Sequence, residues 1–205
     1  MAEISKLHAL ENERNRISSE MHDDLGSGLT RISYLSDKAL VHASETEKEE
    51  ITKISAYAND LVRNMGEIIW AMNSRFDNAE SLAAYIRRYA SEYLEEHHID
   101  LSFSVDGGQD ATTLSGEKRR ALFLVIKEIL HNTVKYAGCH SVSIQIQTIP
   151  SLQITILENG GKGFDPTTAS SLGNGLHNMH KRISGIGGTL QIQKTELGMY
   201  FVITA

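Results

Sequence analysis

The sequence predicts two domains of different class: an all-α helical hairpin that forms a dimeric four-helix bundle, followed by an α+β sandwich. In the first third of the chain, apolar residues recur every three or four positions, the period of an amphipathic helix. Both prolines, Pro150 and Pro166, lie in the last third, so no proline interrupts a helix before them. After about residue 80, alternating segments typical of strands appear between helical ones. This mixture favours one sheet and one helical layer.

The first domain is expected to span residues 1–75. One apolar stripe runs from Leu7 to Leu35, long enough for a helix of about eight turns. A second stripe runs from Ile51 to Met72, after a polar stretch that we interpret as a solvated turn and a first helical turn. One antiparallel hairpin cannot bury both stripes, whereas two copies can close a four-helix bundle. We therefore predict a homodimer.

The second domain is expected to span residues 80–205, with the boundary between Asn73 and Glu80. The order of elements mixes helices with adjacent strands, as an α+β sandwich requires. The expected elements are helices at 82–96 and 116–136 and one ending near 186, and strands at 101–105, 142–146, 152–156, 190–192 and 200–203.

Composition excludes several classes of function. The formal net charge of -6 argues against binding to nucleic acid or to an anionic membrane and favours a protein partner. The single cysteine, Cys139, cannot form an internal disulfide, which fits a reducing compartment. There is no apolar run of about 18 residues, and residues 1–20 carry too many charges for a signal peptide. We expect a cytosolic protein, or the cytosolic part of a longer one.

Three polar residues of the helix at 116–136 share one side. Glu128, Asn132 and Lys135 are spaced by four and three residues, so their side chains project in the same direction. A carboxylate and an amide oxygen suit a hard cation such as magnesium, and a lysine suits phosphate. A surface helix commonly carries such residues without any function, so this trio gains weight only from the loops that follow it.

Two glycine-rich loops follow the trio in the sequence. Residues 160–163 (GGKG) come after a strand, and residues 173–176 (GNGL) open a helix. Glycine permits close approach of the backbone to a ligand, and the N-terminus of a helix favours phosphate. Either loop alone could be an ordinary connection, but both loops after an Asn-bearing helix indicate a nucleotide site.

The first helix carries a candidate nucleophile. In residues 20–26 (EMHDDLG), His22 is followed directly by Asp23. An imidazole beside a carboxylate can accept a phosphoryl group from a nucleotide. The other histidines show no metal-ligand spacing, and we interpret them as surface or packing residues; they include His97, His98, His131, His140, His177 and His180.

Together, these segments resemble the cytoplasmic kinase core of a two-component sensor histidine kinase, in the subfamily whose regulators commonly carry a helix-turn-helix output domain. Residues 14–29 resemble the HisKA_3-type phosphoacceptor box, residues 128–137 the N box, and residues 160–165 and 173–182 the two glycine boxes. The similarity covers nearly the whole chain. It implies a dimerisation and histidine phosphotransfer hairpin at residues 1–75 and a catalytic ATP-binding domain of the HATPase_c type, with the GHKL (Bergerat) fold, at residues 80–205.

The resemblance also implies an activity: ATP-dependent autophosphorylation of His22, followed by phosphoryl transfer to an aspartate in the receiver domain of a response regulator. Asp23 would orient His22, and Glu128 would position or deprotonate it through water. Asn132 would bind Mg²⁺. The residues expected to bind ATP are Asn132, Lys135, Asn159, Gly161, Gly163, Gly173, Gly175 and Leu176. The implied location is cytoplasmic, without membrane contact by this segment, and any membrane anchor would belong to other parts of the full-length protein.

Three positions depart from the family pattern. The family has an Asp that binds the adenine amino group two residues before the Gly-x-Gly, where counting back gives Asn159, while strand alternation gives Glu158. Tyr136 stands where the N box often has His. Ser27 stands where the subfamily often has the Gln that orients water for dephosphorylation of the regulator.

Two alternatives remain open at this stage. A degenerate kinase fold, acting as a dimeric scaffold that binds a regulator with weak or no ATP turnover, would be consistent with Asn159 in the adenine position. A different GHKL protein, such as a serine-kinase anti-sigma factor, would not need the hairpin that carries His22.

Overall fold

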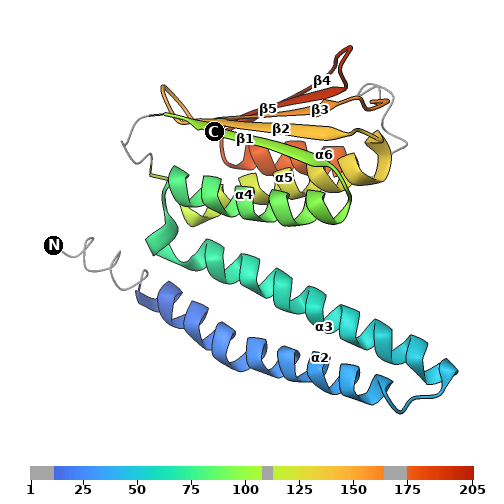
Figure 1. Ribbon diagram of the computed structural model, residues 1–205. Coiled ribbons are helices and arrows are strands. Elements are labelled where there is room, and N and C mark those ends of the chain that lie inside the picture. The colour runs from blue at the N-terminus through green and yellow to red at the C-terminus, as the bar shows by residue number, and fades with distance from the viewer. Residues whose placement is uncertain (1–11, 108–112, 164–174) are drawn as a thin grey trace. The chain divides into compact units, whose positions relative to one another are not determined.

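The computed structural model describes residues 12–107, 113–163 and 175–205. The chain divides into two compact units, Met1–Phe76 and Asp77–Ala205, and each is described by itself (Figure 1). The division falls inside the interval that the sequence predicts, between Asn73 and Glu80.

The first unit is a helical hairpin. Residues 12–20 are α-helical and continue through a π-helical segment, η1 (Met21–Gly26), into α2 (Ser27–Leu40). The second helix, α3 (Glu45–Met72), begins in the polar stretch, where the side chain of Glu47 accepts a hydrogen bond from the backbone N–H of Ser44 (2.9 Å). This bond satisfies a group that a helix N-terminus leaves unpaired. A short 3₁₀ turn, η2 (Ser74–Phe76), ends the unit.

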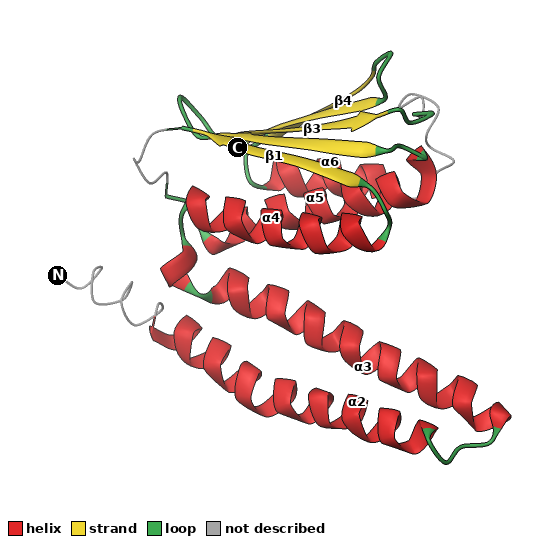
Figure 2. Ribbon diagram, viewed as in Figure 1, coloured by secondary structure: helices red, strands yellow, loops and turns green. Residues whose placement is uncertain are grey.

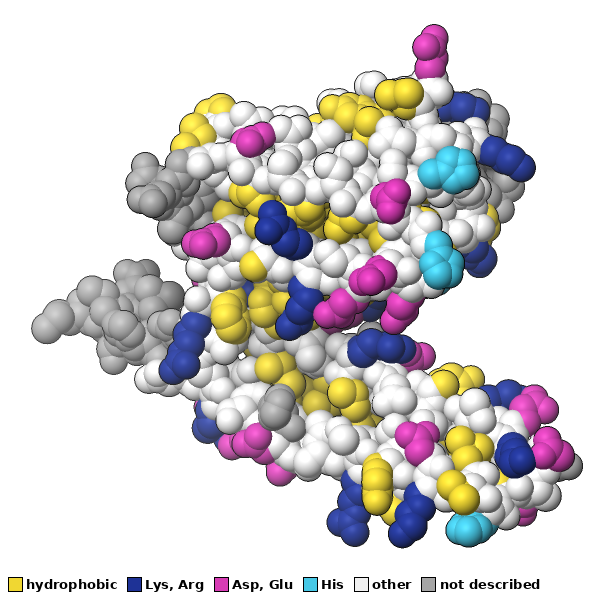
Figure 3. Space-filling model, in the orientation of Figure 1, with side chains coloured by type: hydrophobic (Ala, Val, Ile, Leu, Met, Phe, Trp, Pro, Cys, Tyr) yellow, Lys and Arg dark blue, Asp and Glu magenta, His cyan; other side chains and the backbone are white. Residues whose placement is uncertain are grey.

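Small and polar side chains lie between the two helices of the hairpin. Ser33 Oγ donates to Asn59 Oδ1 (3.0 Å), Ser55 Oγ donates to Asp37 Oδ1 (2.8 Å), and Ala58 is buried. Several large apolar residues of both stripes are instead about half exposed, and Figure 3 shows hydrophobic side chains among charged ones on the surface of the hairpin. They include Leu25, Ile32, Leu35, Ile54 and Leu61.

The second unit is a two-layer α+β sandwich (Figure 2). Every element expected from the sequence is present within a few residues of its predicted bounds, so the predicted fold class is confirmed. The elements are α4 (Ala79–Glu96), β1 (Asp100–Asp106), α5 (Gly116–Asn132), the π-helical segment η3 (Thr133–Ala137), β2 (Ser141–Gln147), β3 (Gln153–Asn159), α6 (Gly175–Gly185), β4 (Thr189–Lys194) and β5 (Met199–Thr204).

One face of the sheet carries the helices. The strand order is β1-β2-β3-β5-β4; β1 pairs parallel to β2 and the other pairs are antiparallel. Helices α4, α5 and α6 cover the same face of this sheet (Figure 1). In β3 the buried residues alternate as Ile154, Ile156 and Glu158. Because successive side chains of a strand point to opposite faces, Glu158 lies on the helix-covered face and Asn159 on the other.

An ion pair fixes the start of the second unit. The guanidinium of Arg119, on α5, is fully buried and donates through Nη2 to Asp77 Oδ1 (2.6 Å). The backbone N–H of Leu114 donates to the carbonyl oxygen of Asp77 (3.1 Å). The first residue after the hairpin is therefore anchored to the domain that follows it.

Candidate functional site

A cavity of about 290 Å³ lies in the second unit, between the end of α5, the end of β3 and the start of α6. It brings together most of the site residues expected for that unit. Its lining comprises Glu128, His131, Asn132, Lys135, Tyr136, Ala137, Glu158, Gly163, Gly175 and Leu176.

Glu158 forms a polar spot deep in this cavity. Its side chain is only 2% exposed, and Oε1 lies 2.6 Å from the hydroxyl of Thr133. That hydroxyl also lies 2.8 Å from the carbonyl oxygen of Ile129, so its single hydrogen can serve only one of the two acceptors. The other carboxylate oxygen, Oε2, is buried and lacks a hydrogen-bond partner among the described residues. A buried acceptor without a partner is costly, and a ligand donor would relieve that cost.

The burial of Glu158 also affects its protonation. Removal from solvent raises the pKa of this carboxyl, and hydrogen bonds from Thr133 and from the Met199 backbone oppose the shift. A donor placed at Oε2 would further favour the ionised form. The cavity thus contains a buried carboxyl group with an oxygen, Oε2, that can still accept a hydrogen bond.

Asn159 does not join this group. Its side-chain amide donates to Ser141 Oγ (3.2 Å) on the neighbouring strand, on the opposite face of β3. Gly161 lies behind the cavity wall, packed near Ala137, and the next residue's N–H donates to the Ala137 carbonyl oxygen (2.9 Å). The two alignments of the sequence offered Asn159 or Glu158, and of these it is Glu158 that lines the cavity.

The three polar residues of α5 and η3 face the cavity together. Asn132 Nδ2 lies 3.4 Å from Glu128 Oε1, a contact that does not use the amide oxygen of Asn132. The ammonium of Lys135 lies over the ring of Tyr136, 5.0 Å from its centroid, and interaction with Tyr136 raises the pKa of Lys135. Lys135 therefore stays charged at neutral pH, and it projects from the turn that follows Asn132.

Gly175 opens α6 directly against Glu128. A Cβ at this position would lie 2.7 Å from Glu128 Oε1, so a larger residue would displace that carboxylate. Gly163 has φ of +59°, a conformation that glycine adopts without strain. Leu176 lines the cavity one residue further along α6. Gly173 lies outside the described residues.

The hairpin holds the other two expected site residues. His22 and Asp23 both belong to the π-helical segment η1, a rare geometry that occurs frequently at functional sites. The His22 side chain is not among those described, whereas Asp23 is exposed at the helix surface. Ser27 Oγ donates back to the carbonyl oxygen of Asp24 (3.3 Å), so the hydroxyl is engaged with its own helix.

The sequence interpretation missed His131, which was expected to be a surface or packing residue. It lines the cavity one position before Asn132. Its spacing of three residues from Glu128 was a signal that the sequence did contain.

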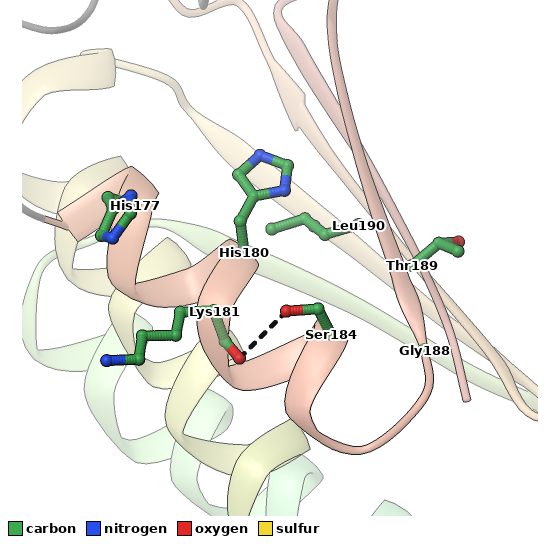
Figure 4. Close-up of a pocket in the computed structure, with 7 residues that line it drawn as sticks. All are labelled: His177, His180, Lys181, Ser184, Gly188, Thr189 and Leu190. Carbon is green, nitrogen blue, oxygen red and sulfur yellow. Dashed lines mark hydrogen bonds between the residues drawn. The ribbon is translucent and has the colours of Figure 1, made fainter.

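A second, more open pocket of about 630 Å³ lies between α6 and β4 (Figure 4). It is lined by His177, His180, Lys181, Ser184, Gly188, Thr189 and Leu190. The Ser184 hydroxyl donates to the Lys181 carbonyl oxygen (3.2 Å) and so caps its own helix. Its lining, as described, includes none of the site residues expected from the sequence, so the smaller cavity is the candidate site.

Comparison with known proteins finds relatives among the histidine kinases. Residues 13–75 match the family model HisKA_3, described as histidine kinase. The chain is 29% identical over 194 residues to the signal transduction histidine-protein kinase/phosphatase UhpB of Salmonella typhimurium, covering 92% of this chain and 38% of that protein. It is 23% identical over 195 residues to the sensor histidine kinase LiaS of Bacillus subtilis, covering 93% of this chain and 53% of that protein. The chain thus spans about half or less of these relatives' length.

Solved structures show the same fold at low sequence identity. The histidine kinase domain of the blue-light activated histidine kinase from Erythrobacter litoralis superposes with a TM-score of 0.55 at 14% identity, covering 87% of this chain and 93% of that one. Full-length ShkA in complex with AMPPNP gives 0.56 at 15% identity, covering 95% and 45%. The resemblance to a sensor histidine kinase core is confirmed.

Two searches of the described residues gave negative results. None of their helices is long and apolar enough to cross a membrane. They also contain no cluster of three or more His, Cys, Asp or Glu side chains that could hold a metal ion.

Proposed function

We propose that this chain catalyses ATP-dependent phosphorylation of its own His22 and passes the phosphoryl group to an aspartate in the receiver domain of a response regulator. The observation that carries the proposal is the cavity that joins Glu158, whose Oε2 has no hydrogen-bond partner among the described residues, to the row of Glu128, Asn132 and Lys135. Its inner end accepts a hydrogen-bond donor, and its outer end offers ligands for phosphate and a hard cation.

Glu158 is the proposed partner of adenine. The exocyclic amino group of adenine is a donor that could pair with the buried Oε2, and Thr133 holds the other oxygen of the same carboxylate. Hydrogen bonds to a charged acceptor contribute roughly 1.5–3 kcal/mol each, more than those between neutral groups. Guanine has a carbonyl oxygen at the equivalent ring position, which would face the carboxylate unfavourably, so the pocket favours ATP.

The outer end of the cavity suits the triphosphate. Lys135 supplies a positive charge, and the N-terminus of α6 begins at Gly175, beside Glu128 and Asn132. The positive end of a helix dipole favours phosphate. The Asn132 amide oxygen, with oxygens of the nucleotide, would hold Mg²⁺, which would neutralise charge on the phosphates during transfer.

The chemical step is an in-line displacement at phosphorus. A nitrogen of His22 forms a bond to the γ-phosphorus as the bond to the β,γ-bridging oxygen breaks, and ADP leaves with that electron pair. The other imidazole nitrogen then releases its proton. We assign Asp23 to orient the ring and stabilise its positive charge, and Glu128 to receive the proton through water.

We also infer a homodimer built on the hairpin. The half-exposed Leu35 and Leu61 belong to apolar stripes that would become the core of a four-helix bundle with a second copy. The alternative of a regulator-binding scaffold without ATP turnover drew its support from Asn159 in the adenine position. Because Glu158 lines the cavity and Asn159 contacts Ser141 instead, we take that support to be weakened.

The test is incubation of the protein with Mg²⁺ and ATP labelled at the γ-phosphate. We expect label on the protein that is labile in acid and stable in base, as phosphohistidine is, and that moves to a receiver domain. ATP binding without incorporated label would support the scaffold alternative. Acid-stable label would indicate phosphorylation of a hydroxyl group and contradict the proposed reaction.

A further inference from the structure

An aromatic column on α4 and α5 leads from the hydrophobic core to the rim of the nucleotide cavity. The ring of Phe123, 1% exposed, packs edge-on against Tyr89 with centroids 5.3 Å apart. Tyr89 stacks on Tyr93, one helical turn further along α4, with centroids 5.6 Å apart. The column ends at His131, whose ring lies 5.0 Å from that of Tyr93.

His131 is held by two tyrosines although it is exposed to solvent. Its Nε2 lies 3.4 Å from the hydroxyl of Tyr89, and its ring leans at 45° on Tyr93. A solvated surface histidine commonly samples several rotamers, whereas a ring that is packed against and hydrogen-bonded to neighbouring groups is held in one orientation. The structure therefore positions this imidazole at the cavity without the help of a ligand.

The imidazole stands at the phosphate end of the cavity. His131 precedes Asn132 and follows Glu128 by three residues, so it shares their turn of α5. Gly175, the first residue of α6, lies against this same turn. Thr133, which contacts the adenine-facing Glu158, follows His131 by two residues and therefore projects from the other side of the helix. A ring at His131 is thus placed to meet phosphate oxygens and not the base.

The cavity and a bound triphosphate together would carry an excess of negative charge beside His131. The described cavity lining contains two carboxylates, Glu128 and Glu158, against one lysine, Lys135. The triphosphate of ATP adds several negative charges. An imidazole N–H donated to a phosphate oxygen would offset part of this excess, more strongly if the ring is protonated.

We propose that His131 binds a phosphate oxygen of the nucleotide, with Tyr89 and Tyr93 as its positioning residues. This inference rests on the proposed function, because it assumes that ATP occupies the cavity. It gives the site a second cationic or donor group beside Lys135. It also explains why a column of aromatic residues runs across two helices to a residue that remains exposed.

The test is calorimetric titration of the full-length chain with ATP, ADP and adenosine. His131→Ala should weaken ATP and ADP about tenfold, as expected for loss of one hydrogen bond to a charged group, and should change adenosine less than about twofold. His131→Lys should retain ATP affinity to within about threefold. The matched control is His97→Ala, because His97 contacts the same Tyr93 ring (4.7 Å) from α4 and does not line the cavity.

A double-mutant cycle tests the positioning role. Tyr89→Phe keeps the stack and removes the hydroxyl, so it should weaken ATP about two- to threefold in the wild-type background and have no effect beside His131→Ala. Equal effects in both backgrounds would show that Tyr89 acts independently of His131 and would overturn its role.

The outcomes separate this inference from the proposed function. If the unmodified chain binds neither ATP nor adenosine, the proposed function fails. If it binds ATP and His131→Ala binds it equally well, or loses ATP and adenosine to the same extent, the phosphate contact is refuted. A loss in His97→Ala as large as that in His131→Ala would likewise contradict it.

Discussion

In the hairpin, serine and alanine side chains lie between the two helices, whereas isoleucine and leucine fill the space between sheet and helices in the second unit. Ser33 and Ser55 are 8% exposed, whereas Leu35 and Leu61 of the same two helices are 51% exposed. In the second unit, Ile126 and Ile154 are completely buried. The sheet unit therefore completes its core within one chain, whereas the hairpin buries Met65 and Trp70 but leaves several other large apolar side chains about half exposed.

This difference in packing suits the two units to different roles. A domain with a closed core can hold a rigid pocket, as the second unit does around Glu158. A hairpin with open apolar stripes is suited to assembly with a second copy, and its Asp23, beside the proposed phosphoacceptor His22, is exposed. Both units have a π-helical segment at residues of the proposed site, η1 around His22 and η3 around Lys135.

The largest expected effect is a loss of autophosphorylation rate without a loss of ATP affinity. Asp23→Asn should slow autophosphorylation by up to about 10⁴-fold, by analogy with amidation of the aspartate that orients a protease histidine, and should leave ATP affinity unchanged. Single-turnover phosphorylation measures the rate. The matched control is Asp24→Asn, the next residue of the same π-helical segment, which should phosphorylate at the normal rate; equal losses in both would remove Asp23 from the mechanism.

The second prediction tests whether the open stripe is an interface. Leu61→Glu should raise the dimer dissociation constant at least about 100-fold, because burial of a leucine contributes about 1.5–3 kcal/mol and the change occurs twice in a dimer. Ala56→Glu, an exposed position on the opposite side of α3, should leave the dimer intact. Sedimentation velocity distinguishes the two; a Leu61→Glu chain that stays dimeric would show that the stripe is not the contact.

The third prediction tests the closed core of the sheet unit. Asp77→Ala leaves the buried guanidinium of Arg119 without this partner and should destabilise the second unit by about 3 kcal/mol. Hydrogen exchange of α5 amides during urea unfolding would report this loss. In the hairpin, Glu49→Ala removes an exposed i,i+4 pair with Lys53 and should change stability by less than about 0.5 kcal/mol. Similar losses of stability from the two substitutions would contradict the claim that the sheet unit has a closed core and the hairpin does not.

The smallest effect concerns the register of β3. Glu158→Gln should weaken ATP about tenfold, because the amide is a weaker acceptor than the carboxylate, while Asn159→Asp should change ATP affinity less than about twofold. Calorimetry measures both. If Asn159→Asp raises ATP affinity and Glu158→Gln leaves it unchanged, adenine contacts residue 159 and not Glu158.

The sequence predicted the order and approximate bounds of the elements because hydrophobic period reports directly on which face is buried. At Glu158 and Asn159, two ways of aligning the sequence give different results. Counting back from the glycines assumes a loop of fixed length, and the extra glycine of Gly160-Gly161 breaks that assumption. The alternation of Ile154 and Ile156 depends only on the pleat of the strand, and it predicts that Glu158 lies on their face, where the structure has it lining the cavity.

Other features depended on tertiary contacts. The position of His131 was predictable from helical spacing, but its support by Tyr89 and Tyr93 comes from a separate helix. The π-helical segments differ from an α-helix by one hydrogen-bond step, which leaves no distinct mark in the apolar period. The serine contact between α2 and α3 was likewise hidden, because the apolar stripes dominate the pattern of both helices.

The central claim is that the hairpin accepts the phosphoryl group and the second unit binds the nucleotide. Its most direct test measures ATP binding and acid-labile label in parallel on His22→Ala and Asn132→Ala. We predict that His22→Ala binds ATP with unchanged affinity and incorporates no label, whereas Asn132→Ala loses both binding with Mg²⁺ and label. Label on the His22→Ala chain, or unimpaired ATP binding by Asn132→Ala, would contradict the account.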